Sequence, residues 1–170
     1  VEIAGVNAAD AVTLSGDGEA LARLGEELKS RHVFFKMLPL NYAFHSSRMD
    51  PIRQELLADL ADLGICRPRL HFISAVTGRE ELGGTPASYW WENVRQSVNF
   101  HGAVQTALEL GVRHFLEIGP HSILLRYLRS GLDKAACAQG GSLDGWVGGT
   151  LSRNSGAGQF DTAWRNAWIH

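Results

Sequence analysis

Strand-like and helix-like segments alternate between residues 70 and 151, and this alternation restricts the possible folds more than any other feature. Three short apolar strands are predicted, at Leu70–Ala75, His114–Ile118 and Trp146–Leu151. Helical segments are predicted between them, at Tyr89–Val94, at Phe100–Leu110 and from about His121 to Leu132. Strands that alternate with helices in this way are typical of parallel βαβ units. The sequence therefore predicts an α/β fold.

The first 40 residues have a different pattern. Val1–Val6 and Ala11–Ser15 read as two strands joined by a polar turn, and Asp17 is placed to cap a following helix. Leucines at 21, 24 and 28 fall on one face of that helix, and Val33–Leu38 is again strand-like. This order matches the last three strands and the second helix of a ferredoxin-like unit. We expect the first strand and helix of that unit to lie outside the chain.

Two further segments have clear local signals. Asp50-Pro51 is typical of a helix start, and Gly64 of a helix end. Between them, apolar residues recur at helical spacing and predict a buried stripe made of Leu56, Leu57, Leu60 and Leu63. Lys134–Gly145 is rich in small residues and predicts a loose surface loop.

Composition excludes several classes of function. Of the 170 residues, 45% are hydrophobic and 20% charged, which is ordinary for a globular protein, and the net charge of -2 comes without a cluster of Lys and Arg. We therefore expect no nucleic-acid partner. No apolar run approaches the length of a membrane span, so no membrane association is expected. Cys66 and Cys137 lack metal-binding spacing, which favours buried or inert thiols in a reducing cytoplasm.

His45 is the residue with the clearest chemical potential. It lies between a strand-like segment and the helix start near Asp50, and loop positions held by rigid elements often carry catalytic groups. A histidine can act as a general base near neutral pH, although a packing or capping role is the alternative. His114, Glu117 and His121 do not form a convincing metal set, because a strand end and a helix start separate them. We expect no metal site.

Four segments, in order, resemble the acyltransferase domains of polyketide synthases. The first is Gly5-Val6-Asn7 with Val12-Thr13-Leu14-Ser15-Gly16, which is similar to that family's ferredoxin-like hairpin. The second is Tyr42-Ala43-Phe44-His45-Ser46, which resembles its specificity and catalytic-histidine motif. The third runs from Tyr89 to Phe100, with Ser97 where the family often has proline, and the fourth from Phe115 to His121. The resemblance covers Val1 to about Leu151.

The resemblance implies a fold and a division of the chain. Residues 1–40 would be part of the small ferredoxin-like subdomain. Residues 41–151 would be the C-terminal part of a large α/β-hydrolase-like subdomain. Residues 152–170 would be a linker that follows the acyltransferase domain.

The resemblance also implies roles for individual residues. His45 would be the catalytic base, and the backbone carbonyl of Asn93 would hold its imidazole ring in the correct tautomer. Tyr42 and Phe44 would line the substrate pocket. The substrates would be an acyl-CoA donor and the phosphopantetheine thiol of an acyl carrier protein, with no cofactor bound by the domain itself.

The nucleophile of that family has no match in this chain. The family uses a serine in a Gly-His-Ser-x-Gly elbow, and no Gly-x-Ser-x-Gly occurs among the 170 residues. The family's carboxylate-binding arginine and oxyanion-hole glutamine also belong to an upstream segment. We therefore expect the chain alone to be inactive and to work with a missing N-terminal acyltransferase segment and neighbouring synthase domains.

The substrate motif is a hybrid. In the family, His-Ala-Phe-His goes with malonyl units and Tyr-Ala-Ser-His with methylmalonyl units, whereas this chain has Tyr42 and Phe44. Phe44 adjoins His45 and would fill the space that an α-methyl branch needs, so malonyl-CoA is the expected donor. Two alternatives stay open: a non-catalytic docking or scaffold module, and a free-standing malonyl transferase of fatty-acid synthesis.

Overall fold

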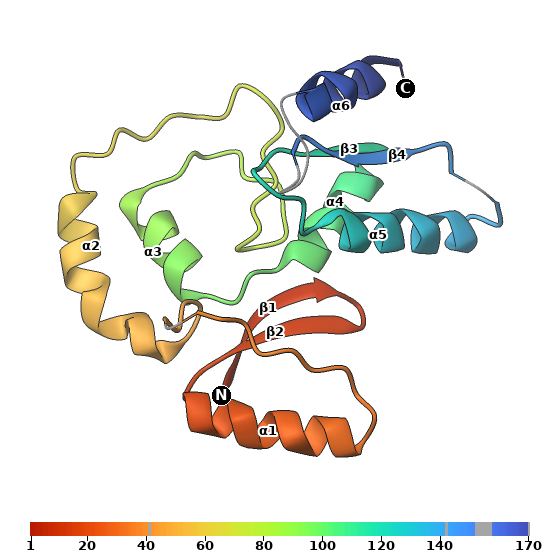
Figure 1. Ribbon diagram of the computed structural model, residues 1–170. Helices are drawn as coiled ribbons and strands as arrows, with labels where there is room; N and C mark the ends of the chain where they lie inside the picture. The colour runs from red at the N-terminus through yellow and green to blue at the C-terminus, as the bar shows by residue number, and fades with distance from the viewer. Residues whose placement is uncertain (41, 142, 152–157, 170) are drawn as a thin grey trace. The chain divides into compact units, whose positions relative to one another are not determined.

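The computed structural model describes the chain except residues 41, 142, 152–157 and 170, and it is shown in Figure 1. The chain forms two compact units, Val1–Phe100 and residues 101–170. Both units combine helices with a two-stranded sheet, which confirms the predicted α/β class.

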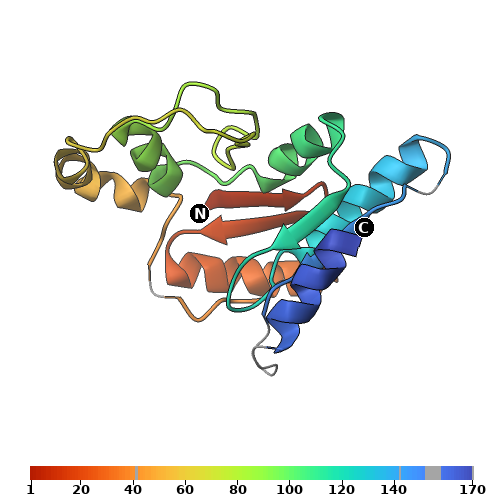
Figure 2. The ribbon, with the colours of Figure 1, turned by 90° about the horizontal axis from the view of Figure 1, so that it is seen from above.

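The first unit is built on a β-hairpin. Strands β1 (Glu2–Ala8) and β2 (Ala11–Ser15) pair in antiparallel register, with Val6 opposite Val12, and run side by side in Figure 2. On the other side of β1, the backbone of Val98 accepts a hydrogen bond from the Val6 N–H (2.8 Å) and donates one to the Ala4 carbonyl (2.9 Å). The segment around Val98 therefore lies beside β1 as a short parallel extension of the sheet.

Helix α1 (Gly18–Ser30) begins as predicted, because the Asp17 carboxylate accepts the Ala20 N–H at 3.0 Å. The predicted strand at Val33–Leu38 is wrong. This segment is extended and returns along α1 (Figure 1), where the Phe35 ring packs on Gly25 so closely that a Cβ there would lie 2.5 Å from the ring. A strand needs a neighbouring edge to pair with, and the residues described here offer this segment none.

The helical segment after His45 differs from the prediction at both ends. A 3-10 helix, η1 (Ser47–Ile52), leads into α2 (Arg53–Asp59), and its N-cap is Ser46. Asp50 does not start the helix, because it lies inside η1, and its carboxylate accepts a hydrogen bond from Arg95 at 2.6 Å. The helix also ends before Gly64. The predicted buried stripe is wrong, because Leu56, Leu57 and Leu60 are only half-buried and Leu63 is 43% exposed.

The predicted strand at Leu70–Ala75 is likewise wrong. The segment makes a single antiparallel bridge between Ile73 and Glu80 across a turn that contains Gly78, at φ +72°. This bridge is isolated and its partner is only seven residues away, so the segment forms no strand of a parallel sheet. The buried hydroxyl of Ser74 lies 3.0 Å from the Tyr89 hydroxyl and ties this turn to helix α3 (Ala87–Arg95), which forms where the aromatic segment predicted it.

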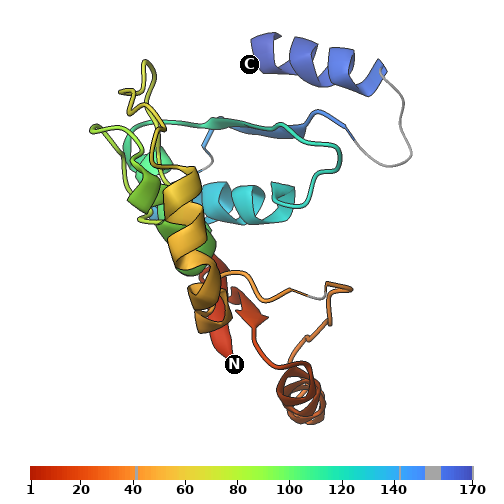
Figure 3. The same cartoon turned by 90° about the vertical axis from the view of Figure 1, so that its left-hand side faces the viewer.

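The second unit is a βαβ arrangement, as predicted. Helix α4 (Phe100–Glu109) precedes it, and strands β3 (His114–Glu117) and β4 (Trp146–Gly149) are parallel, with helix α5 (Leu125–Ala138) as their crossover. Helix α6 (Gly158–Ile169) contacts both strands and lies on the side opposite α5, as Figures 1 and 3 show. Across the helices described, none combines the length and apolarity of a membrane span.

Helix α5 starts and ends later than predicted. Both carboxylate oxygens of Glu117 accept backbone N–H groups, from Ile123 at 2.8 Å and Leu124 at 3.0 Å, and this holds the residues before α5 in a loop. At the other end the helix continues to Ala138, so the first part of the predicted loop Lys134–Gly145 is helical. Residues 134–138 fit both the spacing of a helix and the small-residue composition of a loop, so the sequence alone does not locate the end of α5.

Candidate active site around His45

His45 lies in the turn before η1 and has an uncommon backbone conformation. Its φ of +60° is in the left-handed region, which residues other than glycine seldom adopt. The backbone N–H of His45 donates to the Val94 carbonyl in α3 at 2.9 Å. Residues held in such a conformation by tertiary contacts cluster at functional sites.

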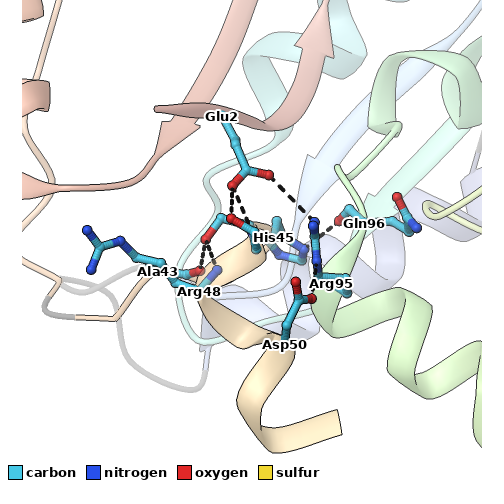
Figure 4. Close-up of polar contacts among 9 residues, drawn as sticks. Glu2, Ala43, His45, Arg48, Asp50, Arg95 and Gln96 are labelled. Atoms are coloured by element: carbon cyan, nitrogen blue, oxygen red, sulfur yellow. Dashed lines mark hydrogen bonds and ion pairs between the residues drawn. The ribbon is translucent and has the colours of Figure 1, made fainter.

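The imidazole ring is oriented by a backbone carbonyl. Nδ1 of His45 lies 2.9 Å from the carbonyl oxygen of Gln96 (Figure 4). A carbonyl oxygen only accepts hydrogen bonds, so Nδ1 carries the proton and Nε2 keeps a lone pair. This is the tautomer that a general base requires, and the carbonyl has the orienting role that a carboxylate has in a catalytic triad.

The backbone carbonyl that contacts the His45 ring belongs to Gln96 and not to Asn93, which corrects the expectation from the sequence. Asn93 is an exposed residue in the last turn of α3, where carbonyls point along the helix axis. The helix ends at Arg95, and Gln96 is extended, with φ -78° and ψ 156°. Its carbonyl therefore turns out of the helix and reaches His45.

Ser46 fixes the turn that carries His45. Its side chain is fully buried, donates to the Ala43 carbonyl at 2.7 Å and accepts the Arg48 N–H at 3.4 Å. These contacts make Ser46 the N-cap of η1, and a hydroxyl engaged in this way is a structural group, not a nucleophile.

Tyr42 and Phe44 form an aromatic pair beside the imidazole. Their ring centroids lie 4.7 Å apart, and the Phe44 ring is 6.3 Å from the His45 ring. Both aromatic side chains are exposed, Tyr42 at 55% and Phe44 at 42%. The structure thus brings the predicted substrate-binding residues to the predicted base.

A charged cluster next to His45 was not predicted from the sequence. Figure 4 shows the Arg95 guanidinium between the carboxylates of Glu2 and Asp50. The Ser47 hydroxyl donates a hydrogen bond to Glu2. The hydrogen bonds from Ser47, helped by the charge of Arg95, hold the pKa of Glu2 below its ordinary value. Arg95 lies in the segment from Tyr89 to Phe100 that resembles the family, and this could have marked it as a site residue. No local pattern indicated Glu2.

The other candidates have different surroundings. Glu117 is occupied in capping the loop before α5, and over the part of the chain that the structure describes, no three His, Cys, Asp or Glu side chains form a group that could hold a metal ion. Cys66 and Cys137 are exposed thiols, so of the two expected states, buried or inert, the buried one is wrong.

Comparison with protein families gives one match, to a model described as the acyl transferase domain, over residues 1–167. The chain is 37% identical over 145 residues to polyketide synthase GfsB of Streptomyces halstedii, covering 84% of this chain and 2% of that protein. It is 37% identical over 159 residues to the mycoketide-CoA synthase of Mycobacterium tuberculosis, covering 92% of this chain and 4% of that protein. The chain thus spans only a small share of these relatives.

Solved structures of acyltransferases are also similar to this chain. The acyltransferase domain from module 8 of the salinomycin polyketide synthase superposes with a TM-score of 0.89 at 32% identity, covering 99% of this chain and 39% of that one. The malonyl CoA-acyl carrier protein transacylase of Clostridium perfringens superposes with a TM-score of 0.79 at 21% identity, covering 99% and 49%. At that identity, the second likeness shows a shared fold and nothing finer.

Proposed function

The chain belongs to the acyl transferase domain family, and from this premise we propose that it supplies the general base of an acyltransferase in a polyketide synthase. The complete enzyme would load an extender acyl group, malonyl by preference, from acyl-CoA onto an acyl carrier protein. The orientation of His45 by Gln96 supports this proposal most directly, because it leaves Nε2 free to accept a proton.

The proposed reaction has two half-reactions. In the first, a serine outside these 170 residues attacks the thioester carbonyl and passes its proton to Nε2 of His45, which then protonates the departing CoA thiolate. In the second, the phosphopantetheine thiol of the carrier protein attacks the acyl-serine, again with its proton taken by His45. The proton then returns to the serine oxygen, so the enzyme is restored in a ping-pong cycle.

The other residues of the site have proposed roles as well. The orienting role belongs to Gln96 in this proposal, and not to Asn93, because the Gln96 carbonyl contacts the ring. Tyr42 and Phe44 would form the wall against which the acyl group lies. The proposed partners are the acyl-CoA donor, the acyl carrier protein and the N-terminal acyltransferase segment with its neighbouring domains, in the cytoplasm.

The experiment is acyl loading by the full-length protein that contains this chain. After incubation with malonyl-CoA, peptide mass spectrometry should find a malonyl group on a serine outside residues 1–170, and added carrier protein should remove it. Absence of both the acyl-serine and carrier loading would contradict the proposal and favour the docking-module alternative. Transfer to a free-standing carrier protein alone would favour the fatty-acid synthesis alternative.

A further inference from the structure

Arg95 connects two segments that are far apart in the sequence. Its Nε donates to Asp50 in η1 at 2.6 Å, and its NH1 lies 3.6 Å from Glu2 in β1. The arginine is the last residue of α3, immediately before Gln96, whose carbonyl holds the His45 ring. The Arg95 side chain thus links the end of α3 with η1, which follows the histidine turn, and with β1 (Figure 4).

Glu2 extends this link to the histidine turn itself. One of its oxygens accepts both the backbone N–H of Ser47, at 2.9 Å, and the Ser47 hydroxyl, at 2.6 Å. The other oxygen faces Arg95. Ser47 lies two residues after His45, so Arg95 restrains the histidine turn through Glu2 and restrains η1 through Asp50.

The burial of the cluster favours a positioning role over a contribution to bulk stability. The side chain of Arg95 is 25% exposed, whereas Glu2 and Asp50 are 41% and 55% exposed. Exposed ion pairs contribute little to the stability of a fold, because water and salt screen the charges. A catalytic group, by contrast, must be held to within about 0.5 Å of its productive position.

His45 has a particular need for such restraint. Its backbone is in the left-handed region, and such a conformation persists only where its surroundings fix it. The backbone bond to Val94 and the ring bond to Gln96 both depend on the distance between the histidine turn and the end of α3. The cluster of Glu2, Ser47, Asp50 and Arg95 spans that distance.

We propose that Arg95 is a positioning residue, which holds the His45 imidazole on the Gln96 carbonyl by joining the end of α3 to Glu2 and Asp50. This inference rests on the proposed function, because it explains how the base is kept in register for proton transfer. Arg95 itself need not touch the substrate.

The kinetic test uses Arg95→Gln in the full-length protein, with Arg48→Gln as the matched control. Arg48 is on η1 as well, but its side chain pairs with Asp17, at 3.5 Å, outside the cluster. Arg95→Gln should lower kcat for acylation by malonyl-CoA about 10- to 100-fold, with KM within about twofold of wild type, because misplacement of about 1 Å can cost 10²-fold in rate. Arg48→Gln should match wild type, and Arg95→Lys, which keeps one charged contact, should recover part of the loss.

A second readout does not depend on activity. Hydrogen exchange of peptides that cover residues 43–52 should be faster in Arg95→Gln than in wild type or Arg48→Gln, because the N–H groups of His45 and Ser47 lose their restraint. If wild type transfers no acyl group, the proposed function fails, and the exchange comparison still decides the positioning role.

Three results would overturn the inference: equal kinetic losses in Arg95→Gln and Arg48→Gln, a raised KM with unchanged kcat, or unchanged exchange over residues 43–52. Should Arg95→Gln fail to fold, Glu2→Gln and Asp50→Asn each remove one contact and keep the arginine. Intermediate kinetic losses in both would support the positioning role. Failure of these two variants to fold would make the cluster a fold requirement and would overturn it.

Discussion

The Nδ1 atom of His45 lies 2.9 Å from the carbonyl oxygen of Gln96, a residue 51 positions further along the chain. Neither residue could fix this contact alone. The turn capped by Ser46 presents the ring, and the end of α3 at Arg95 releases the carbonyl from the helix. The contact selects one tautomer, and the proposed base chemistry follows from that selection.

His45→Ala in the complete acyltransferase domain should abolish self-acylation by malonyl-CoA and leave the fold intact. Loss of a general base costs on the order of 10² to 10⁴ in rate. Single-turnover acylation measures the loss, and circular dichroism checks the fold. His71→Ala is a matched control, since His71 is exposed and contacts Glu80 on a separate turn. Acylation at the wild-type rate in His45→Ala would remove this histidine from the mechanism.

The elements that sequence predicted well are those with strong local signals. The hairpin, the Asp17 cap of α1, helices α3 and α4, and the parallel β3–β4 pair follow from residue pattern and turn chemistry. His45, Tyr42 and Phe44 share one short motif, which is why the sequence predicts them together, and their rings lie close together in the structure, whereas their roles stay a prediction.

The features that sequence missed depend on contacts between distant segments or on single-residue boundaries. Whether Asn93 or Gln96 meets the ring depends on where α3 ends, and pattern locates helix ends only to within a few residues. The Val33–Leu38 segment has strand composition, but a strand also needs an edge to pair with. The contact of Glu2 with Ser47 joins residues 45 positions apart, so no local pattern could reveal it.

Glu2→Gln should make the stability of the complete domain less sensitive to acid. The hydrogen bonds from Ser47, and the charge of Arg95, hold the pKa of Glu2 in the folded protein below the ordinary value of about 4.3. Its contribution to stability is therefore present above that ordinary value and is lost as pH falls through the lowered one. Urea unfolding between pH 6 and 3 should show wild type and Glu2→Gln converging at the acid end.

Ser47→Ala is the control for this prediction, because it removes the hydroxyl that is the largest cause of the lowered pKa. Its stability should also fall less with acid than that of wild type. A stability difference between wild type and Glu2→Gln that stays constant over the whole pH range would show that Glu2 does not titrate as inferred.

Ser97→Pro should stabilise the complete domain. The Ser97 hydroxyl is buried and has no hydrogen-bond partner among the residues of the structure as described, which is a cost that removing the hydroxyl relieves. Gln96 before it already has the extended backbone that a following proline requires. Proline also restricts the unfolded chain, and compatible substitutions of this kind contribute about 0.4–1 kcal/mol.

Thermal unfolding measures this effect, with Ser97→Ala as the variant that removes the hydroxyl alone. The alanine variant should show part of the gain. A lower melting temperature for the proline variant, with a gain for alanine, would mean that the Ser97 backbone cannot accept the ring.

Residues 1–170 expressed alone should transfer no acyl group and should aggregate. Apolar side chains are exposed in both units, with Phe34 at 80%, Leu70 at 85% and Ile118 at 80%. Such surfaces associate in water. Light scattering and an acyl-transfer assay check the prediction, and a monodisperse, active product would contradict it.

Phe44→Ser in the complete domain should shift donor preference from malonyl-CoA toward methylmalonyl-CoA. The Phe44 ring lies 6.3 Å from the His45 ring and packs with Tyr42 at 4.7 Å, so it occupies space next to the base. Serine would vacate that space and leave room for an α-methyl branch. One methyl contact is worth about 1–3 kcal/mol, so the ratio of kcat/KM values should change by some 10- to 200-fold.

Competition between the two donors, read out on the carrier protein, measures the ratio, and Tyr42→His tests the other half of the hybrid motif. A wild-type preference for methylmalonyl-CoA would mean that Tyr42, or a residue outside this chain, controls the choice, because the Phe44 ring would then leave the branch enough room.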